Sequence, residues 1–223
     1  MTAIDTTSPS DLKKLNLVER IDLKLIETSR PILEKPAVRK FGQIGKAGDD
    51  KILLMLSAGI ILAGLASRNG KLQRTGSRML IAQIVAKATK EAGKSSVDRT
   101  RPSKQIESGR YAAKAGNSKA TELRSFPSGH TASALSVARA FSREYPKYTK
   151  PVLTAAAVIG FLQIPRRANY PGDVAAGAGA GLVAEKIADR LVSTYHKLRG
   201  SRARKAKHRA LPKLRSLRPR LLR

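Results

Sequence analysis

Residues 126–131 read Phe-Pro-Ser-Gly-His-Thr and lead into residues 130–141, whose alanine-rich composition favours a helix. Ser128 and Gly129 stand directly before that predicted helix. Free backbone N–H groups and the missing glycine side chain suit a bound anion at such a position. His130 follows at once and is able to give a proton to a departing oxygen atom. The stretch therefore predicts a helix start that binds an anion and carries an acid.

A second polar segment supplies positive charge. Residues 94–102 read Lys-Ser-Ser-Val-Asp-Arg-Thr-Arg-Pro and lie in a polar stretch, residues 93–126, that has no clear periodicity. Lys94 offers a point charge and Arg101 a planar fork of donors, which together suit the oxygens of a phosphoryl group. Each residue alone is typical of a solvated loop. Their combination with residues 126–131 predicts a phosphate-binding pocket.

A third segment, residues 163–173, reads Gln-Ile-Pro-Arg-Arg-Ala-Asn-Tyr-Pro-Gly-Asp. Together the three segments resemble the signature motifs of the type 2 phosphatidic acid phosphatase and vanadium haloperoxidase superfamily, over roughly residues 50–190. This resemblance implies an all-α fold and metal-independent hydrolysis of a phosphate ester, with no cofactor. It also implies that the partner is a lipid phosphate or diphosphate, or another phosphorylated substrate.

The resemblance also implies a role for each matching residue. The phosphoryl group would be held by Lys94, Arg101, Ser128 and Gly129, with His130 as general acid and Asp173 orienting the nucleophile. The chain departs from the family pattern at two positions, because Asn169 stands where the nucleophilic histidine belongs and Gln163 where an arginine belongs. An amide has no activated form that attacks phosphorus, so we expect hydrolysis to be absent or much reduced.

Substitutes for the two missing groups lie nearby in the sequence. Arg166 or Arg167 would be able to replace the family's arginine, because both lie in the same loop. His130 would be able to attack phosphorus itself, although the motif places it on the leaving-group side. The chain is therefore either a membrane phosphatase-like enzyme or a non-catalytic protein that binds a lipid phosphate or serves in assembly.

Two apolar runs set the predicted architecture. Residues 52–66 and 151–164 contain no charge, but both are shorter than the roughly 20 apolar residues that cross a bilayer comfortably. Each run is compatible with a buried core helix or with a membrane helix. Taken with the resemblance, they predict a membrane-embedded, all-α bundle of about five core helices and no β-strand. We expect these helices at residues 52–66, 78–92, 130–141 and 151–164, with a polar loop at 67–77. The fifth begins at Asp173, which suits the cap position.

The N-terminal part, residues 11–45, mixes charged residues with aliphatic ones. The residues that recur at helical spacing and form an apolar stripe are Leu15, Val18, Ile21 and Leu25, with Leu17 and Ile26 at its edges. Leu23 falls off this stripe, and Pro31 and Pro36 interrupt the segment. An amphipathic segment lying on a membrane or on the core and an ordinary half-buried surface helix are equally compatible with this pattern. We divide the chain into an N-terminal amphipathic segment (1–50), a phosphatidic acid phosphatase-like helical domain (51–195) and a basic tail (196–223).

The charge balance indicates an anionic partner. The chain has 44 lysine and arginine residues against 16 acidic ones, a net charge of +28, and no cysteine, which excludes disulfide and thiol chemistry. Residues 197–223 hold 12 lysine or arginine residues and no acid. We expect this tail to be disordered and to lie near anionic lipids. A nucleic-acid-associated protein is an alternative suggested by charge alone, and the tail's lack of aromatic residues argues against it.

The alternation of five helices gives a topology. If the basic tail lies in the cytoplasm, as the positive-inside rule indicates, the fifth helix begins on the outer side. Lys94, His130 and Asp173 then all fall at outer helix ends. We therefore expect a multi-pass membrane protein with its phosphate pocket on the outer face.

Overall fold

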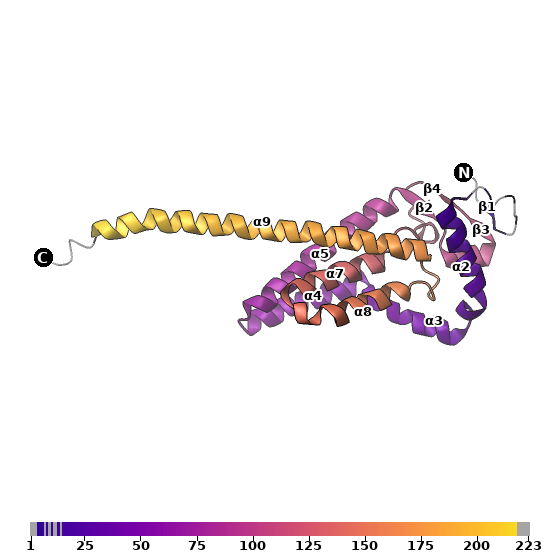
Figure 1. Cartoon of the computed structure of the whole chain (residues 1–223), viewed down its shortest axis with the longest axis horizontal. Helices are drawn as coiled ribbons and strands as arrows, with labels where there is room; N and C mark the ends of the chain where they lie inside the picture. Colours follow the sequence, from indigo (N-terminus) through magenta and orange to yellow (C-terminus); the bar gives the residue numbers. More distant parts are fainter. Residues whose placement is uncertain (1–3, 7, 9, 11–12, 14, 218–223) are drawn as a thin grey trace.

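The computed structural model describes residues 4–6, 8, 10, 13 and 15–217. Figure 1 shows an elongated bundle, with an N-terminal arm crossing one end and one helix projecting far beyond the other end. The bundle helices are α4 (Asp50–Ala66), α5 (Gly70–Lys94), α7 (Gly129–Glu144), α8 (Thr149–Phe161) and α9 (Pro171–Leu217). The arm consists of α2 (Leu17–Leu33) and α3 (Pro36–Gly42), and the 3-10 helix η1 (Gln43–Gly48) joins it to α4. The expectation of a mostly helical bundle is confirmed.

The connection between α4 and α5 is shorter than we expected. Asn69 caps α5, because its side-chain oxygen accepts hydrogen bonds from the backbone N–H groups of Lys71 at 3.0 Å and Leu72 at 3.2 Å. The helix therefore begins at Gly70. The prediction of a polar loop over residues 67–77 was wrong from residue 70 onward, because polarity alone does not prevent a capped helix.

The polar stretch between α5 and α7 contains short elements that the sequence did not indicate. They are β2 (Val97–Arg99), α6 (Pro102–Ser108), β3 (Arg110–Tyr111), β4 (Ala113–Ala115) and the 3-10 helix η2 (Thr121–Leu123). Strand β2 pairs antiparallel with β4, and β3 pairs antiparallel with β1 (Ile4–Asp5). The prediction of no β-strand was wrong, because strands of two or three residues are too short to display an alternating pattern.

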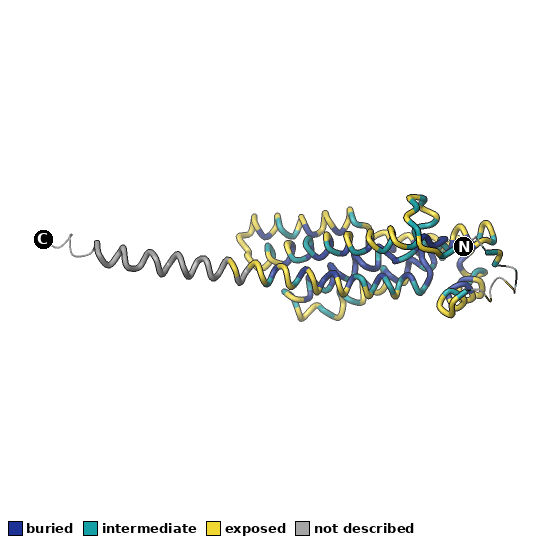
Figure 2. The backbone as a smooth tube through the Cα atoms, turned by 90° about the horizontal axis from the view of Figure 1, so that it is seen from above, coloured by how far each residue is buried: buried dark blue, intermediate teal, exposed yellow. Residues whose placement is uncertain are grey.

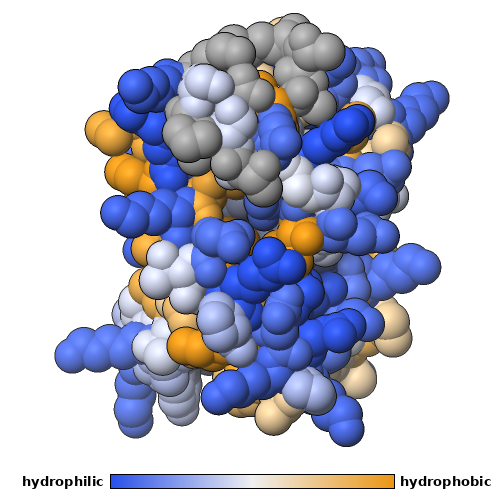
Figure 3. Space-filling model, turned by 90° about the vertical axis from the view of Figure 1, so that its right-hand side faces the viewer, coloured by the Kyte–Doolittle hydropathy of each residue, from blue (hydrophilic) through white to orange (hydrophobic). Residues whose placement is uncertain are grey.

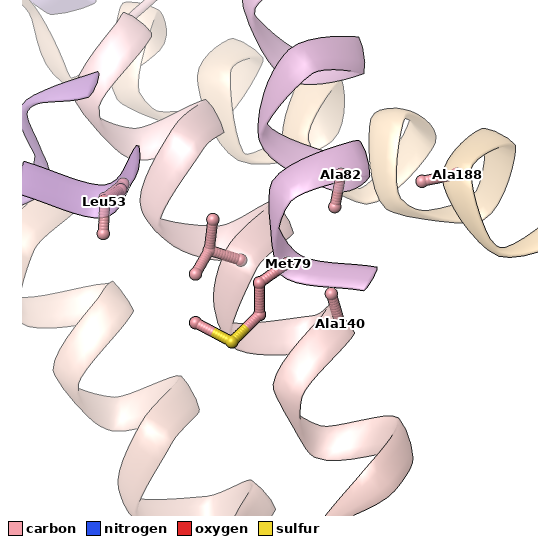
Figure 4. Packing of buried hydrophobic residues seen from close by; sticks show 6 residues of the cluster. Leu53, Met79, Ala82, Ala140 and Ala188 are labelled. Carbon is pink, nitrogen blue, oxygen red and sulfur yellow. The ribbon is translucent and has the colours of Figure 1, made fainter. Parts of the chain in front are cut away.

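Small side chains let the bundle helices approach closely. One core cluster consists of Leu53, Met79, Ala82, Val137, Ala140 and Ala188, and Figure 4 shows Leu53 and Met79 together with alanines of α5, α7 and α9. Figure 2 shows that buried residues concentrate in the half of the bundle nearer the N-terminus. That half is the one that supports the helix ends described below.

The arm packs on the bundle through residues off the predicted stripe or at its edge. Leu23 and Ile26 are 7% and 1% exposed, whereas Ile21 and Leu25 of the predicted stripe are 49% and 46% exposed. Leu23, Ile26 and Leu33 form a second core cluster with Tyr111 and Tyr170. Val18, Ile21 and Leu25 of the stripe are therefore largely exposed, whereas Leu15 packs against this cluster. Pro31 does not interrupt the helix, which continues to Leu33.

Many large apolar side chains lie on the outside of the bundle. On α4 they include Leu54, Met55, Leu62 and Leu65, and on α9 Leu182, Ile187 and Leu191. Across the described parts of the chain, no helix combines the length with the apolar character that crossing a bilayer demands. Helix α9 continues through most of the basic tail to Leu217, where we expected disorder.

Substitution of two glycines in α9 distinguishes the contribution of close helix packing to stability from that of helix propensity. A Cβ atom on Gly181 would lie 2.6 Å from the backbone oxygen of Ala132 in α7, whereas a Cβ atom on Gly179 would meet nothing within 4 Å. We predict that Gly181→Ala lowers the free energy of unfolding by about 1–2 kcal/mol, because α7 must move away. The control, Gly179→Ala, raises it by up to about 1 kcal/mol through helix propensity alone. Denaturant titration measures both changes, and equal effects of the two substitutions would contradict this packing.

Candidate functional site

The ends of several bundle helices surround a polar pocket of about 260 Å³. Its side chains come from the start of α4, the end of α5, the segment between α5 and α7, the start of α7 and the loop between α8 and α9. The lining residues are Gly48, Asp49, Asp50, Lys90, Glu91, Lys94, Arg101, Arg124, Gly129, His130, Arg166, Ala168 and Asn169. Figure 3 shows the same end of the molecule, on which hydrophilic residues predominate.

Three of the cations in the polar pocket keep their charge available. Lys90 pairs with Asp50, and Arg124 Nη2 lies 2.5 Å from a carboxylate oxygen of Glu91. Among the described residues, no salt bridge is made by Lys94, Arg101 or Arg166. The Nε atom of Arg101 is buried and has no hydrogen-bond partner in the described structure. Burial and neighbouring cations lower the pKa of Lys94 and of Arg101, so a bound anion would relieve both.

The start of α7 forms one wall of the polar pocket. A Cβ atom on Gly129 would lie 3.1 Å from Cδ of Lys90 and 3.6 Å from Nζ of Lys94, so both lysines lie close to the helix start, and a side chain at residue 129 would press on Lys90. Ser128 is buried behind this wall, and its Oγ lies 2.8 Å from Oγ1 of Thr131. The free N–H groups of the helix start and the ammonium group of Lys94 therefore favour an anion at the same place.

His130 lies in the polar pocket beside a carboxylate that the motifs do not include. Its Nε2 lies 3.3 Å from Oδ1 of Asp49, at the start of α4. Burial, and then the charges of Arg166, Lys90 and Lys94, lower the pKa of His130 to about 4, against the opposing effect of Asp49. His130 is therefore neutral near pH 7 unless an anion offsets these cations.

Asn169 is buried in the wall of the pocket with both ends of its amide engaged. Its Nδ2 donates to the backbone oxygen of Ser125 at 2.5 Å, and its Oδ1 accepts a hydrogen bond from Oγ of Ser128 at 3.2 Å. These bonds fix the side chain at the position where the family pattern has a nucleophile. None of the hydrogen bonds of Asn169 in the described structure is made to Asp173.

Asp173 is fully buried and is shared among other partners. Its Oδ1 accepts from Nη1 of Arg99 at 2.5 Å, and its Oδ2 accepts from Oγ of Ser125 at 2.5 Å and from the backbone N–H of Tyr170 at 2.9 Å. Nη2 of Arg99 donates a second hydrogen bond, to Oδ2 of Asp22 in α2, at 2.8 Å. Because α9 begins at Pro171, Asp173 lies within the first helical turn rather than at the cap. Its carboxylate supports the loop conformation instead of orienting residue 169.

The two arginines proposed as substitutes have different positions. Arg166 lines the polar pocket, and its Nη1 donates to Oε1 of Gln163 at 2.8 Å. Arg167 does not line it, and its Nη2 donates to the backbone oxygen of Leu33 at 2.9 Å. Gln163 is buried behind Arg166, where its Nε2 donates to the backbone oxygens of Gly45 and Ile159. Arg166 therefore brings a guanidinium group to the pocket, with Gln163 holding it.

The structure brings together most of the site residues that the sequence indicated. Lys94, Arg101, Gly129, His130, Arg166 and Asn169 line the polar pocket, while Ser128 and Asp173 support it from behind. Sequence reasoning missed Asp49, Asp50, Lys90 and Arg124. Lys90 had a usable signal, because it lies one helical turn before Lys94 and so shares its face. The two aspartates had none beyond their place before an apolar run.

Comparison with known proteins gives a family match and a fold match. A profile of the PAP2 superfamily matches residues 76–196. The crystal structure of Aquifex aeolicus LpxE is similar, with a TM-score of 0.52 and 20% sequence identity, over 79% of this chain and 97% of that one. At this identity the likeness concerns the fold alone. Among curated proteins, no sequence match was found.

The neutral state of His130 predicts proton-linked anion binding. Sulfate keeps its two negative charges between pH 5 and pH 7, so any change in its affinity over this range reports on the protein. A bound dianion raises the pKa of His130 from about 4, so binding takes up a proton and strengthens as the pH falls. We expect calorimetric titrations to show this increase in the unmodified protein. His130→Asn should flatten the pH dependence, and an unchanged dependence would contradict this role.

Proposed function

We propose, because this chain belongs to the PAP2 superfamily, that its polar pocket binds the phosphate group of a phosphate ester, a lipid phosphate or diphosphate. We propose further that hydrolysis of this ester is absent or much reduced. The family match agrees with the resemblance of the three sequence segments. The observation that carries the proposal is the group of cations without salt bridges, Lys94, Arg101 and Arg166, around the start of α7.

The charge of the polar pocket supports binding of a phosphate. Five lysine and arginine side chains line it against three carboxylates, and two of these carboxylates pair with Lys90 and Arg124. The remaining cations converge from the end of α5, from the residue before α6 and from the α8–α9 loop, which suits an anion with several oxygens. Hydrogen bonds from charged donors to phosphate are among the stronger ones in proteins.

The environment of residue 169 supports the loss of turnover. Asn169 donates to Ser125 and accepts from Ser128, so its amide acts as a structural group. Asp173, which would orient a nucleophile in the family pattern, is committed to Arg99. His130 keeps the place of the general acid, but an acid alone supplies no nucleophile to attack phosphorus.

The outer surface of the bundle supports action at a membrane. Exposed apolar side chains on α4 and α9, and the outward stripe of α2, form surfaces that suit contact with lipid rather than water. The basic residues that follow in α9 suit anionic lipid headgroups. The multi-pass arrangement, with the pocket on the outer face and the tail in the cytoplasm, stays a prediction.

Loss of one guanidinium group tests the binding proposal. We predict that Arg101→Ala weakens binding of inorganic phosphate about tenfold to a hundredfold, because a buried charge-assisted hydrogen bond contributes about 1.5–3 kcal/mol. Arg110→Ala removes the same charge from an exposed residue outside the pocket and should leave the affinity unchanged. Isothermal titration measures both. Equal affinities of the Arg101→Ala variant and the unmodified protein would contradict the proposal.

A further inference from the structure

A second, apolar cavity lies beside the polar pocket. This apolar groove has a volume of about 710 Å³ and separates the N-terminal arm from the segment that joins α8 to α9. None of its lining residues is charged. The arm contributes Leu25, Ile32 and Phe41, and the opposite side contributes Phe161, Ile164 and Pro165.

The groove leaves large apolar side chains in contact with solvent. Ile32, Phe41 and Phe161 are 57%, 58% and 63% exposed. Removing such side chains from water is favourable by about 25 cal/mol for each Å² covered, so an apolar occupant would stabilise the groove. The volume is that of a small-molecule site, within the usual range of about 300–1,000 Å³, rather than that of a flat protein interface.

The two cavities are lined by neighbouring residues of the same two segments. Pro165 lines the apolar groove, and the next residue, Arg166, lines the polar pocket. On the other side, Phe41 lines the groove, and Gly48, at the end of η1, lines the pocket. The chain between them packs on the same loop, since a Cβ atom on Gly42 would lie 2.9 Å from Cγ of Arg166. The apolar groove and the polar pocket are therefore neighbours across the loop between α8 and α9.

We propose that the apolar groove holds the hydrocarbon chain of the phosphate ester whose phosphate group lies in the polar pocket. This inference rests on the proposed function. The cationic pocket selects the anionic end of the molecule, and the uncharged groove accepts its apolar end. Residues of the arm, which lie outside the family match at 76–196, thereby select esters with a long chain. A second copy of this protein in the groove would not explain why a cationic pocket lies beside it, whereas a phosphate ester with a hydrocarbon chain does.

Chain-length dependence tests this assignment. The probes are inorganic phosphate and butyl, hexyl and octyl phosphate below their micellar concentrations, titrated against the full-length protein in one detergent. Each methylene that enters the groove should raise the affinity by up to about fourfold, from about 0.8 kcal/mol for each buried methylene. The double substitution Phe41→Ser and Phe161→Ser should remove most of this gain and leave the affinity for inorganic phosphate unchanged. Both side chains are more than half exposed, so the fold should tolerate their loss.

Leu62→Ser is the matched control, because Leu62 is 64% exposed on α4 and lines neither cavity. It should keep the full chain-length dependence. An unchanged dependence in the Phe41 and Phe161 variant, or an equal loss in the Leu62 control, would overturn the inference. A change of oligomeric state with no change in chain-length dependence would also overturn it and assign the groove to a second copy. Failure of the proposed function is distinct, because inorganic phosphate would then bind equally to the unmodified protein and to Arg101→Ala.

Discussion

The buried ion pair between Asp173 and Arg99 joins the segments that form the polar pocket. Nη1 of Arg99 lies 2.5 Å from Oδ1 of Asp173, and the same carboxylate accepts hydrogen bonds from Ser125 and from the backbone of Tyr170. These partners come from β2, from the loop before α7 and from the start of α9. Because an unpaired buried charge costs several kcal/mol, the three segments keep one relative arrangement. The positions of Arg101, His130 and Asn169 follow from it.

The same ion pair extends the site beyond the family match. Arg99 Nη2 binds Asp22 of α2, and Asp22 accepts the backbone N–H of Gly172 at 2.8 Å. The N-terminal arm is thereby fixed against the loop that carries Asn169. This arrangement places the apolar groove next to the polar pocket. It also engages the carboxylate of Asp173, which in the family pattern orients the nucleophile. Here that carboxylate holds structural segments together instead.

The sequence predicted the parts of the site that belong to local patterns. Lys94, Arg101 and the Ser128-Gly129-His130 helix start lie where the motifs indicated, because each depends on a short run of residues at a helix end. The bonds of Asp173 could not be predicted, since Arg99 was one basic residue among many and its partner Asp22 is 77 positions away. The packed face of α2 was partly misassigned for a similar reason: burial of Leu23 depends on Tyr111 and Tyr170, which only the fold brings near.

We propose that the polar pocket binds a phosphate ester without hydrolysing it, because residue 169 is an asparagine. Phosphorus NMR tests both the binding and the absence of hydrolysis in one sample of the purified protein with octyl phosphate, since bound ester and released phosphate give separate signals. We expect a broadened or shifted ester signal and no growth of the inorganic phosphate signal over many hours. Steady release of phosphate, at a rate that Asn169→Ala leaves unchanged, would contradict it.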